Sequence, residues 1–285
     1  MAVSAKSALA KAIGRTGGGP DGGSSRPASP ISAGEATNLL VQRNYLAYRS
    51  AWWIFVSGFL EPVFYLFSIG VGVGQLVTGF TFNGEVIPYA EFVAPGMLAA
   101  SAMNGAVLDS TYNFFFKLKY NKLFDQMLAT PLTTTDIARG ELTWSLLRGG
   151  CYSAAFLLVM VAMGLVHSWW AVLAVPAALL IGAAFGAVGM ALTTYMRSWQ
   201  DFDYVTLAQL PLFLFSATFF PLSAFPGWIA AIVECTPLYR AVVLVRELTT
   251  GSLTWASGVS LVYLVAMTLV GLAIVGRRLD RLLLS

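Results

Sequence analysis

Residues 169–195 read WWAVLAVPAALLIGAAFGAVGMALTTY, and this stretch contains no charged side chain. A helix needs roughly 20 apolar residues to cross the hydrocarbon core of a bilayer, so the stretch is long enough to span one. Further apolar stretches of suitable length lie at 52–75, 92–113, 141–165, 204–222 and 257–276. Together they predict an all-α polytopic membrane protein with six transmembrane helices.

The composition agrees with this prediction. Hydrophobic residues make up 57% of the 285 residues, and charged residues only 11%. Soluble globular proteins carry about 25% charged residues, so this chain has too few to cover a water-facing surface. The net charge of +3 comes from basic residues spread over the loops rather than gathered on one face. These properties largely exclude soluble enzymes, disordered chains and nucleic-acid binders.

The basic residues also orient the spans. Of the 17 Lys and Arg residues, 14 precede span one, follow span six, or lie between spans two and three or four and five. Only Arg240 and Arg246 fall in the opposite loops. Since cytoplasmic loops carry the excess of Lys and Arg, we expect both termini in the cytoplasm.

The N-terminal segment differs from the rest of the chain. Gly, Ser and Pro dominate residues 14–34, and too few apolar residues are present to form a core. We expect residues 1–34 to be a disordered cytoplasmic tail and 35–285 to be the transmembrane domain. Ser32 and Glu35 have the spacing of a helix capping box. Residues 35–50 then predict an interfacial helix, with a cytoplasmic extension of span one as the alternative.

The loop between spans two and three contains a short amphipathic pattern. Thr130-Pro131 ends it, because proline disfavours helical continuation. The pattern predicts a short helix over 120–129 whose apolar face lies on lipid or docks into a partner. The apolar face consists of Leu123, Phe124, Met127 and Leu128, and the polar one of Lys122, Asp125 and Gln126.

A second interrupted segment lies between spans five and six. Residues 226–233 are apolar but too short to cross, Glu234-Cys235-Thr236-Pro237 follows, and 238–248 is again a short helical stretch that carries Arg240 and Arg246. Two short helices around a proline break predict an extracytoplasmic re-entrant or surface-lying hairpin. It carries Glu234 and Arg240.

Two charges, Glu61 and Arg148, lie within predicted spans, and Asp109 lies near the end of another. Intramembrane charges are costly and face protein or water. Glu61 is either a pathway or gating residue, or a structural ion-pair partner of Arg148.

The sequence contains no nucleotide-binding or hydrolase motif. We therefore expect no enzymatic activity and no catalytic or cofactor-binding residue in this chain. Cys151, Cys235 and His167 cannot complete a four-ligand zinc site, so we predict no metal site and expect both cysteines to be buried.

Several strings resemble the permease subunits of ABC-2 type exporters, in particular their NodJ-like branch, over about residues 35–280. The first two are EPVFYLF at 61–67 and YAEFVAPG at 89–96. The others are FDQMLATPL at 124–132, similar to that family's cytoplasmic segment, and LFSATFFPL at 214–222 with Pro237-Leu238 after it. The long tail departs from the short N-termini of that branch.

The resemblance implies a homo- or heterodimer of permease subunits with two cytoplasmic ATPase subunits, which bind the ATP and Mg. It also implies that helix 120–129 is the ATPase-coupling helix and that Glu234 and Arg240 lie near the outer mouth. Lipids, lipid-linked saccharides, polysaccharides and hydrophobic drugs are the expected substrates, and the bacterial inner membrane is the expected location. Tyr65, Phe215, Phe219 and Phe220 are candidates to line the path, with packing or lipid contact as the alternative.

Other classes of protein stay open. An ion-gradient-driven secondary transporter is the main alternative, although such proteins often show inverted repeats with paired broken helices. This chain shows a single break, at 234–237. A polytopic enzyme would need clustered His, Cys or acidic residues, and a membrane scaffold would not require the outer hairpin.

Overall fold

The computed structural model describes residues 32–49, 60, 63–74, 80–82 and 85–283. The tail up to residue 31 and most of the first predicted span lie outside these residues. In the described part of that span, residues 63–73 are helical and end in the π-helix η2 (Ser68–Val73).

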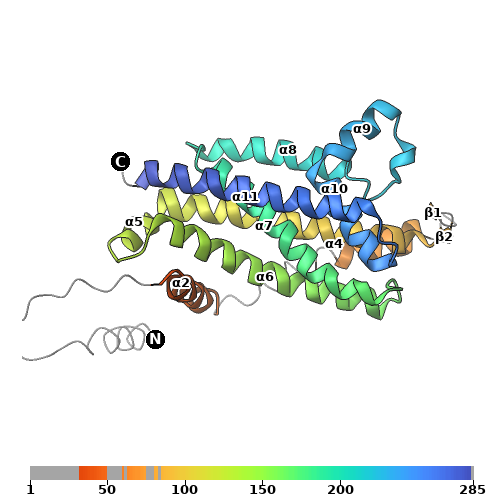
Figure 1. The fold of residues 1–285 in the computed structure, drawn as a ribbon, viewed down its shortest axis with the longest axis horizontal. Helices are drawn as coiled ribbons and strands as arrows, with labels where there is room; N and C mark the ends of the chain where they lie inside the picture. The colour runs from red at the N-terminus through yellow and green to blue at the C-terminus, as the bar shows by residue number, and fades with distance from the viewer. Residues whose placement is uncertain (1–31, 50–59, 61–62, 75–79, 83–84, 284–285) are drawn as a thin grey trace, which may run out of the picture. The chain divides into compact units, whose positions relative to one another are not determined.

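Helix α7 (Ala174–Thr193) is packed directly against α4 (Tyr89–Leu108), α6 (Thr134–Ala162) and α11 (Trp255–Leu283), as Figure 1 shows. Its small residues allow this close approach, as they do in many membrane helices. A Cβ atom on Gly271 of α11 would lie only 2.8 Å from the Cβ of Ala187. The largest hydrophobic cluster of the described residues lies where α4, α7 and α10 (Pro237–Thr250) meet.

Three described helical segments are long and apolar enough to cross a membrane: Thr134–Ala162, Trp169–Thr193 and Trp255–Leu279. The second joins the 3-10 helix η5 (Trp169–Leu173) to α7. They correspond to the spans predicted at 141–165, 169–195 and 257–276. The span predicted at 92–113 is helical as α4, followed by the π-helices η3 (Asp109–Asn113) and η4 (Phe116–Tyr120). The total of six spans and the cytoplasmic termini stay predictions.

The fifth predicted span, 204–222, is wrong at its C-terminal end. Helix α8 spans only Phe202–Leu214, after the short 3-10 helix η6 (Trp199–Asp201). Thirteen residues rise about 20 Å, less than the roughly 30 Å hydrocarbon core. The chain then turns at Ala217, which has a positive φ of 54°, and continues through η7 (Leu222–Ala224).

The two short helices predicted between spans five and six are present. Helix α9 (Gly227–Cys235) and α10 are bent by 83° relative to one another at Thr236. By length and composition the pair is either a broken span or a re-entrant loop. The proline at the first position of α10 explains the break, because it cannot continue the preceding helix.

A small sheet is an addition to the predicted all-α fold. Strands β1 (Phe80–Phe82) and β2 (Glu85–Ile87) pair antiparallel, with Phe80 opposite Ile87. The intervening sequence, Asn83-Gly84, is typical of two-residue hairpin turns.

The predicted capping box is confirmed. The hydroxyl of Ser32 accepts a hydrogen bond from the Glu35 N–H, and the Glu35 carboxylate accepts one from the Ser32 N–H. Helix α2 (Ala33–Tyr48) begins there and packs against α6, with Leu40 seated over Gly140. Leu39 and Leu46 stay exposed, as an interfacial helix requires. Both described cysteines, Cys151 and Cys235, are exposed, so the expectation of buried cysteines is wrong.

Candidate functional site

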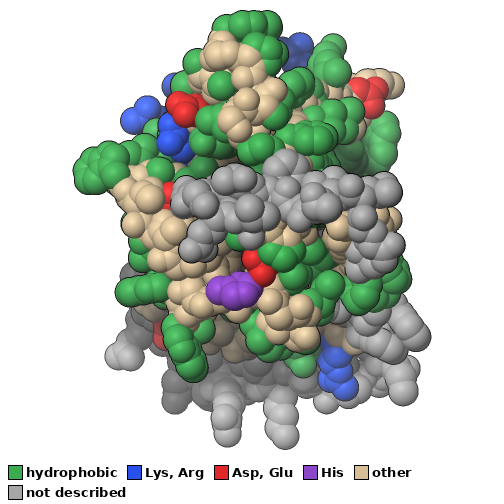
Figure 2. All heavy atoms as spheres, turned by 90° about the vertical axis from the view of Figure 1, so that its right-hand side faces the viewer, with side chains coloured by type: hydrophobic (Ala, Val, Ile, Leu, Met, Phe, Trp, Pro, Cys, Tyr) green, Lys and Arg blue, Asp and Glu red, His purple; other side chains and the backbone are tan. Residues whose placement is uncertain are grey.

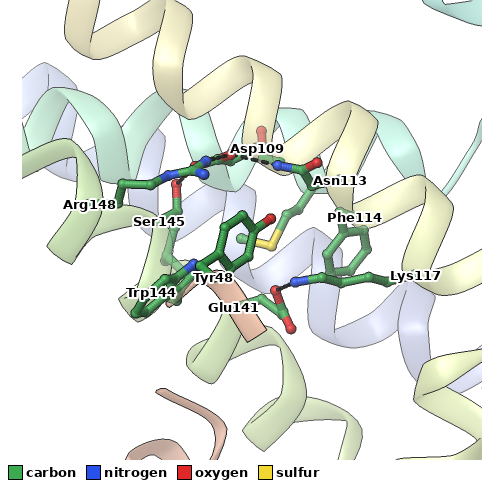
Figure 3. A pocket seen from close by; sticks show the side chains of 12 residues that line it. Tyr48, Asp109, Asn113, Phe114, Lys117, Glu141, Trp144, Ser145 and Arg148 are labelled. Carbon is green, nitrogen blue, oxygen red and sulfur yellow. Dashed lines mark hydrogen bonds and ion pairs between the residues drawn. The ribbon is translucent and has the colours of Figure 1, made fainter. Parts of the chain in front are cut away.

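A network of charged side chains, formed by Asp109, Lys117, Glu141 and Arg148, lies between α6 and the π-helical segments that follow α4 (Figure 3). Arg148 forms a buried ion pair with Asp109. The Asp109 carboxylate also accepts hydrogen bonds from Asn113 Nδ2 at 2.7 Å and Ser145 Oγ at 3.2 Å. The sequence offered Glu61 as one candidate partner of Arg148, and among the described residues Arg148 pairs with Asp109. Glu61 lies outside the described residues, and its role stays a prediction.

The second half of this charge network joins the interfacial helix to the bundle. Lys117 Nζ lies 2.5 Å from Glu141 Oε2. Asn44 of α2 donates to Glu141 Oε1 at 3.4 Å, and Arg43 of the same helix lies 3.9 Å from that oxygen. Since Glu141 and Arg148 are seven residues apart on α6, they lie two turns apart on one face.

The surroundings of the charge network indicate that it holds neighbouring helices together. Removing such charges from water is costly unless each is paired and hydrogen-bonded, and both halves satisfy this condition. Asp109 and Lys117 lie in π-helical segments, which occur frequently at functional sites. A cavity of about 20 Å³ between the two halves is large enough for one water molecule. The network thus ties α2, α6 and the end of α4 into one unit.

The short helix predicted over 120–129 is present as α5 (Leu123–Leu128), but the apolar side chains expected to face lipid or a partner are buried or partly buried within the chain. Phe124 is completely buried in the chain's own core, and its ring lies 5.0 Å from that of Phe114. Met127 is buried beside it, in a cluster that includes Leu40 of α2 and Leu279 of α11. Leu123 and Leu128 pack partly against this cluster. The exposed residues of this segment are the polar ones: Lys122, Asp125 and Gln126.

At the other end of the bundle, Arg246 of α10 connects two segments that are distant in sequence, the start of α4 and the turn after α8. Its guanidinium donates to the Phe92 carbonyl at 3.1 Å and to the Ala217 carbonyl at 2.9 Å, and it lies over the Phe92 ring. The neighbouring Glu247 accepts hydrogen bonds from the N–H and hydroxyl of Thr254, just before α11. These contacts fix the start of α4 and α11 and the turn after α8.

The same end carries a contact between His167 and Glu91. Their Nε2 and Oε1 atoms lie 3.3 Å apart. Figure 2 faces this end and shows the histidine beside an acidic side chain, with mostly apolar and uncharged atoms around them. Sequence reasoning did not pair the two residues.

The remaining predicted site residues do not form one cluster. Glu234 is exposed, and the Arg240 guanidinium lies 5.8 Å from the Tyr239 ring centre. Phe219 packs edge-to-face on Phe213. Three of the predicted path aromatics are exposed on the surface of this chain: Tyr65, Phe215 and Phe220. Their contact with a substrate stays a prediction.

The sequence analysis did not identify Lys117, Glu141 and Arg246 as charged residues that hold the fold together. Arg246 lies in a short helix outside the predicted spans, so nothing in its neighbourhood signals burial. Glu141 marks the start of a predicted span, where a carboxylate is unremarkable. A charge of each sign at Asp109 and Arg148, in two successive predicted spans, was the available signal for the ion pair.

Comparison with known proteins defines the class. Residues 35–250 match the family of ABC-2 type transporters, so the chain belongs to this family of membrane transport permeases. It is 33% identical to Nodulation protein J of Rhizobium leguminosarum bv. viciae over 84% of this chain and 93% of the relative. Nodulation protein J of Sinorhizobium fredii is 34% identical over 72% of this chain and 78% of the relative. The inner membrane transport permease YadH of Escherichia coli is 23% identical over 65% and 72%, respectively. These likenesses confirm the resemblance to the permease subunits.

Proposed function

We propose that this chain is the membrane subunit of an ATP-driven exporter and that a separate ATPase chain supplies the energy through α5. Membership of the ABC-2 family supports the proposal. The observation that carries the role of α5 is its division into two faces. Phe124 and Met127 anchor it in the bundle, whereas Lys122, Asp125 and Gln126 are available to a partner.

This division suits the transmission of force. A partner that moves α5 must also move the elements that Phe124 contacts, because a close-packed cluster transmits displacement rather than absorbing it. The cluster reaches α2, α6 and α11. The charge network lies beside it and links α2 and α6 to the end of α4. Closure of the ATPase would therefore shift several helices together.

The assembly and cargo belong to the same proposal. Two permease subunits, identical or different, would surround the path, and two ATPase subunits would bind ATP and Mg below them. A lipid, a lipid-linked saccharide or a hydrophobic drug would be exported across the inner membrane. Among the named relatives, the inner membrane transport permease supports the proposed location.

Co-purification with charge reversal tests the proposal. The tagged chain is isolated from native membranes in mild detergent, and its partners are identified by mass spectrometry. We expect an ATPase subunit with the wild type and its loss with Asp125→Lys. Asp203→Lys is the matched control, because Asp203 is also an exposed carboxylate, on α8 rather than α5. Both variants should accumulate to wild-type levels, since neither residue is buried.

Two results would contradict the proposal. Absence of any ATPase in several detergents would remove the exporter function and favour gradient-driven transport. Equal retention of the ATPase by Asp125→Lys and wild type would remove α5 as the docking surface while leaving the exporter intact.

A further inference from the structure

A cavity of about 760 Å³ lies between α7 and α8, bounded also by α4, η6 and single residues of α10 and α11. It is separate from the small cavity of the charge network. Its volume is within the range of roughly 300–1,000 Å³ that is common for ligand sites. We propose that this cavity binds one membrane phospholipid with a zwitterionic, amine-bearing headgroup, such as phosphatidylethanolamine, as a resident ligand.

The middle of the cavity matches an acyl chain. Met103 and Val107 of α4, Phe185 and Leu192 of α7, and Leu212 of α8 line it. The two polar residues at this depth already have partners within the chain: Gln209 donates to Asn104 at 2.7 Å, and Thr111 donates to the Val107 carbonyl at 2.6 Å. Ordered water needs about two to four polar partners, which this wall does not offer.

One end of the cavity differs from the rest. Tyr195, Arg197, Ser198, Asp201 and Tyr204 line it where α7 ends and α8 begins. Tyr195 and Tyr204 are also exposed, as expected of aromatic side chains at the level of lipid headgroups. The cavity is therefore amphipathic along its length, with its polar end at the interface and its apolar end toward Pro237 and Met267.

The charges at that end complement a zwitterion. Arg197 lines the cavity and supplies a guanidinium for a phosphate. Arg278 lies 4.0 Å over the ring of Tyr195, another lining residue. Asp201 supplies a carboxylate for the amine. The backbone N–H groups of Arg197 and Ser198 donate to its Oδ2 and hold the pKa of Asp201 below its usual range, so it is ionised at neutral pH.

The apolar inner side of helix α8 explains why a lipid is needed in the cavity. Leu207 and Leu210 are exposed on its outer side, whereas Ala208 and Leu212 face the cavity. Its described contacts with the bundle include the hydrogen bond from Gln209 and the stacking of Phe202 on Tyr112, 4.2 Å apart. An acyl chain between α7 and α8 would cover the inner apolar surface and support a helix that is too short to span the membrane alone.

Lipid retention measured by native mass spectrometry tests the proposal. The full chain, with whatever subunits co-purify, is reconstituted in nanodiscs containing equal amounts of dioleoyl phosphatidylethanolamine and dioleoyl phosphatidylglycerol, and then stripped mildly. We expect one phosphatidylethanolamine retained per chain. Leu212→Trp should lower its occupancy at least about tenfold, equivalent to about 1.4 kcal/mol. Leu210→Trp, on the outer side of the same helix, should retain it.

A second pair of variants tests the headgroup contact and does not alter the apolar wall. Arg197→Gln should reduce retention, whereas Arg139→Gln, an exposed arginine of α6 outside the cavity, should not. If the Leu212→Trp variant does not fold, the two arginine variants alone decide whether the cavity binds the lipid. Equal retention by both members of either folded pair would overturn the site, and preferential retention of phosphatidylglycerol would overturn the headgroup. Because no ATPase is required for the readout, failure here is distinguishable from failure of the exporter proposal.

Discussion

Neutralising Asp109 alone should destabilise the chain more than removing both charges of its ion pair. The side chains of Asp109 and Arg148 are only 10% and 8% exposed. Asp109→Asn preserves the shape of the side chain but leaves the guanidinium buried without its counter-charge. Breaking one partner of a buried pair costs about 3–5 kcal/mol, and we expect this loss in the free energy of unfolding. Arg148→Met should cost a similar amount, because it leaves the carboxylate uncompensated.

The double variant Asp109→Asn/Arg148→Met provides the decisive comparison. Replacing a whole buried pair with uncharged groups is often neutral, so the double variant should be more stable than either single variant. The assay is reversible unfolding in mixed detergent micelles, followed by circular dichroism. Asp125→Asn is the control, since an exposed carboxylate should change stability by no more than about 0.5 kcal/mol. Single-variant losses below about 1 kcal/mol, or additive losses in the double variant, would refute the reasoning.

Three further predictions use the same unfolding assay. Phe124→Ala should cost about 3–5 kcal/mol, because a fully buried aromatic side chain is removed; a change under 1 kcal/mol would contradict its burial. Gly140→Ala should cost about 1–3 kcal/mol, because its Cβ would lie 2.5 Å from Leu40, whereas Gly149→Ala, with no atom within 4 Å, should not destabilise. Glu247→Ala should cost about 1–3 kcal/mol, because the buried hydroxyl of Ser257 in α11 loses its acceptor, and unchanged stability would refute that.

The helices that the sequence predicted best are those with long uninterrupted apolar runs. The stretch 169–195 corresponds to a helical segment at Trp169–Thr193 because its length and composition admit few alternatives. The capping pair of Ser32 and Glu35 is likewise local, and it forms. Local patterns were sufficient wherever the determining contacts lie within one turn of helix.

The predictions that failed depend on contacts between distant segments. Apolar sequence continues past Leu214, but the turn at Ala217 is held by Arg246, 29 residues later. The amphipathic pattern of 120–129 correctly predicts a helix but cannot say that the chain's own α2, α6 and α11 cover Phe124. The partner of Arg148 similarly depends on which spans are neighbours, and spacing alone does not determine this.

Site-specific photo-crosslinking in native membranes tests most directly whether α5 is the coupling element. A photoreactive amino acid replaces Gln126, on the exposed side of α5, or Trp169, which is 93% exposed at the start of η5. We predict a covalent adduct with an ATPase subunit from position 126 and none from position 169. Lack of an ATPase adduct from position 126 in a correctly inserted chain, or equal adducts from both positions, would contradict coupling through α5.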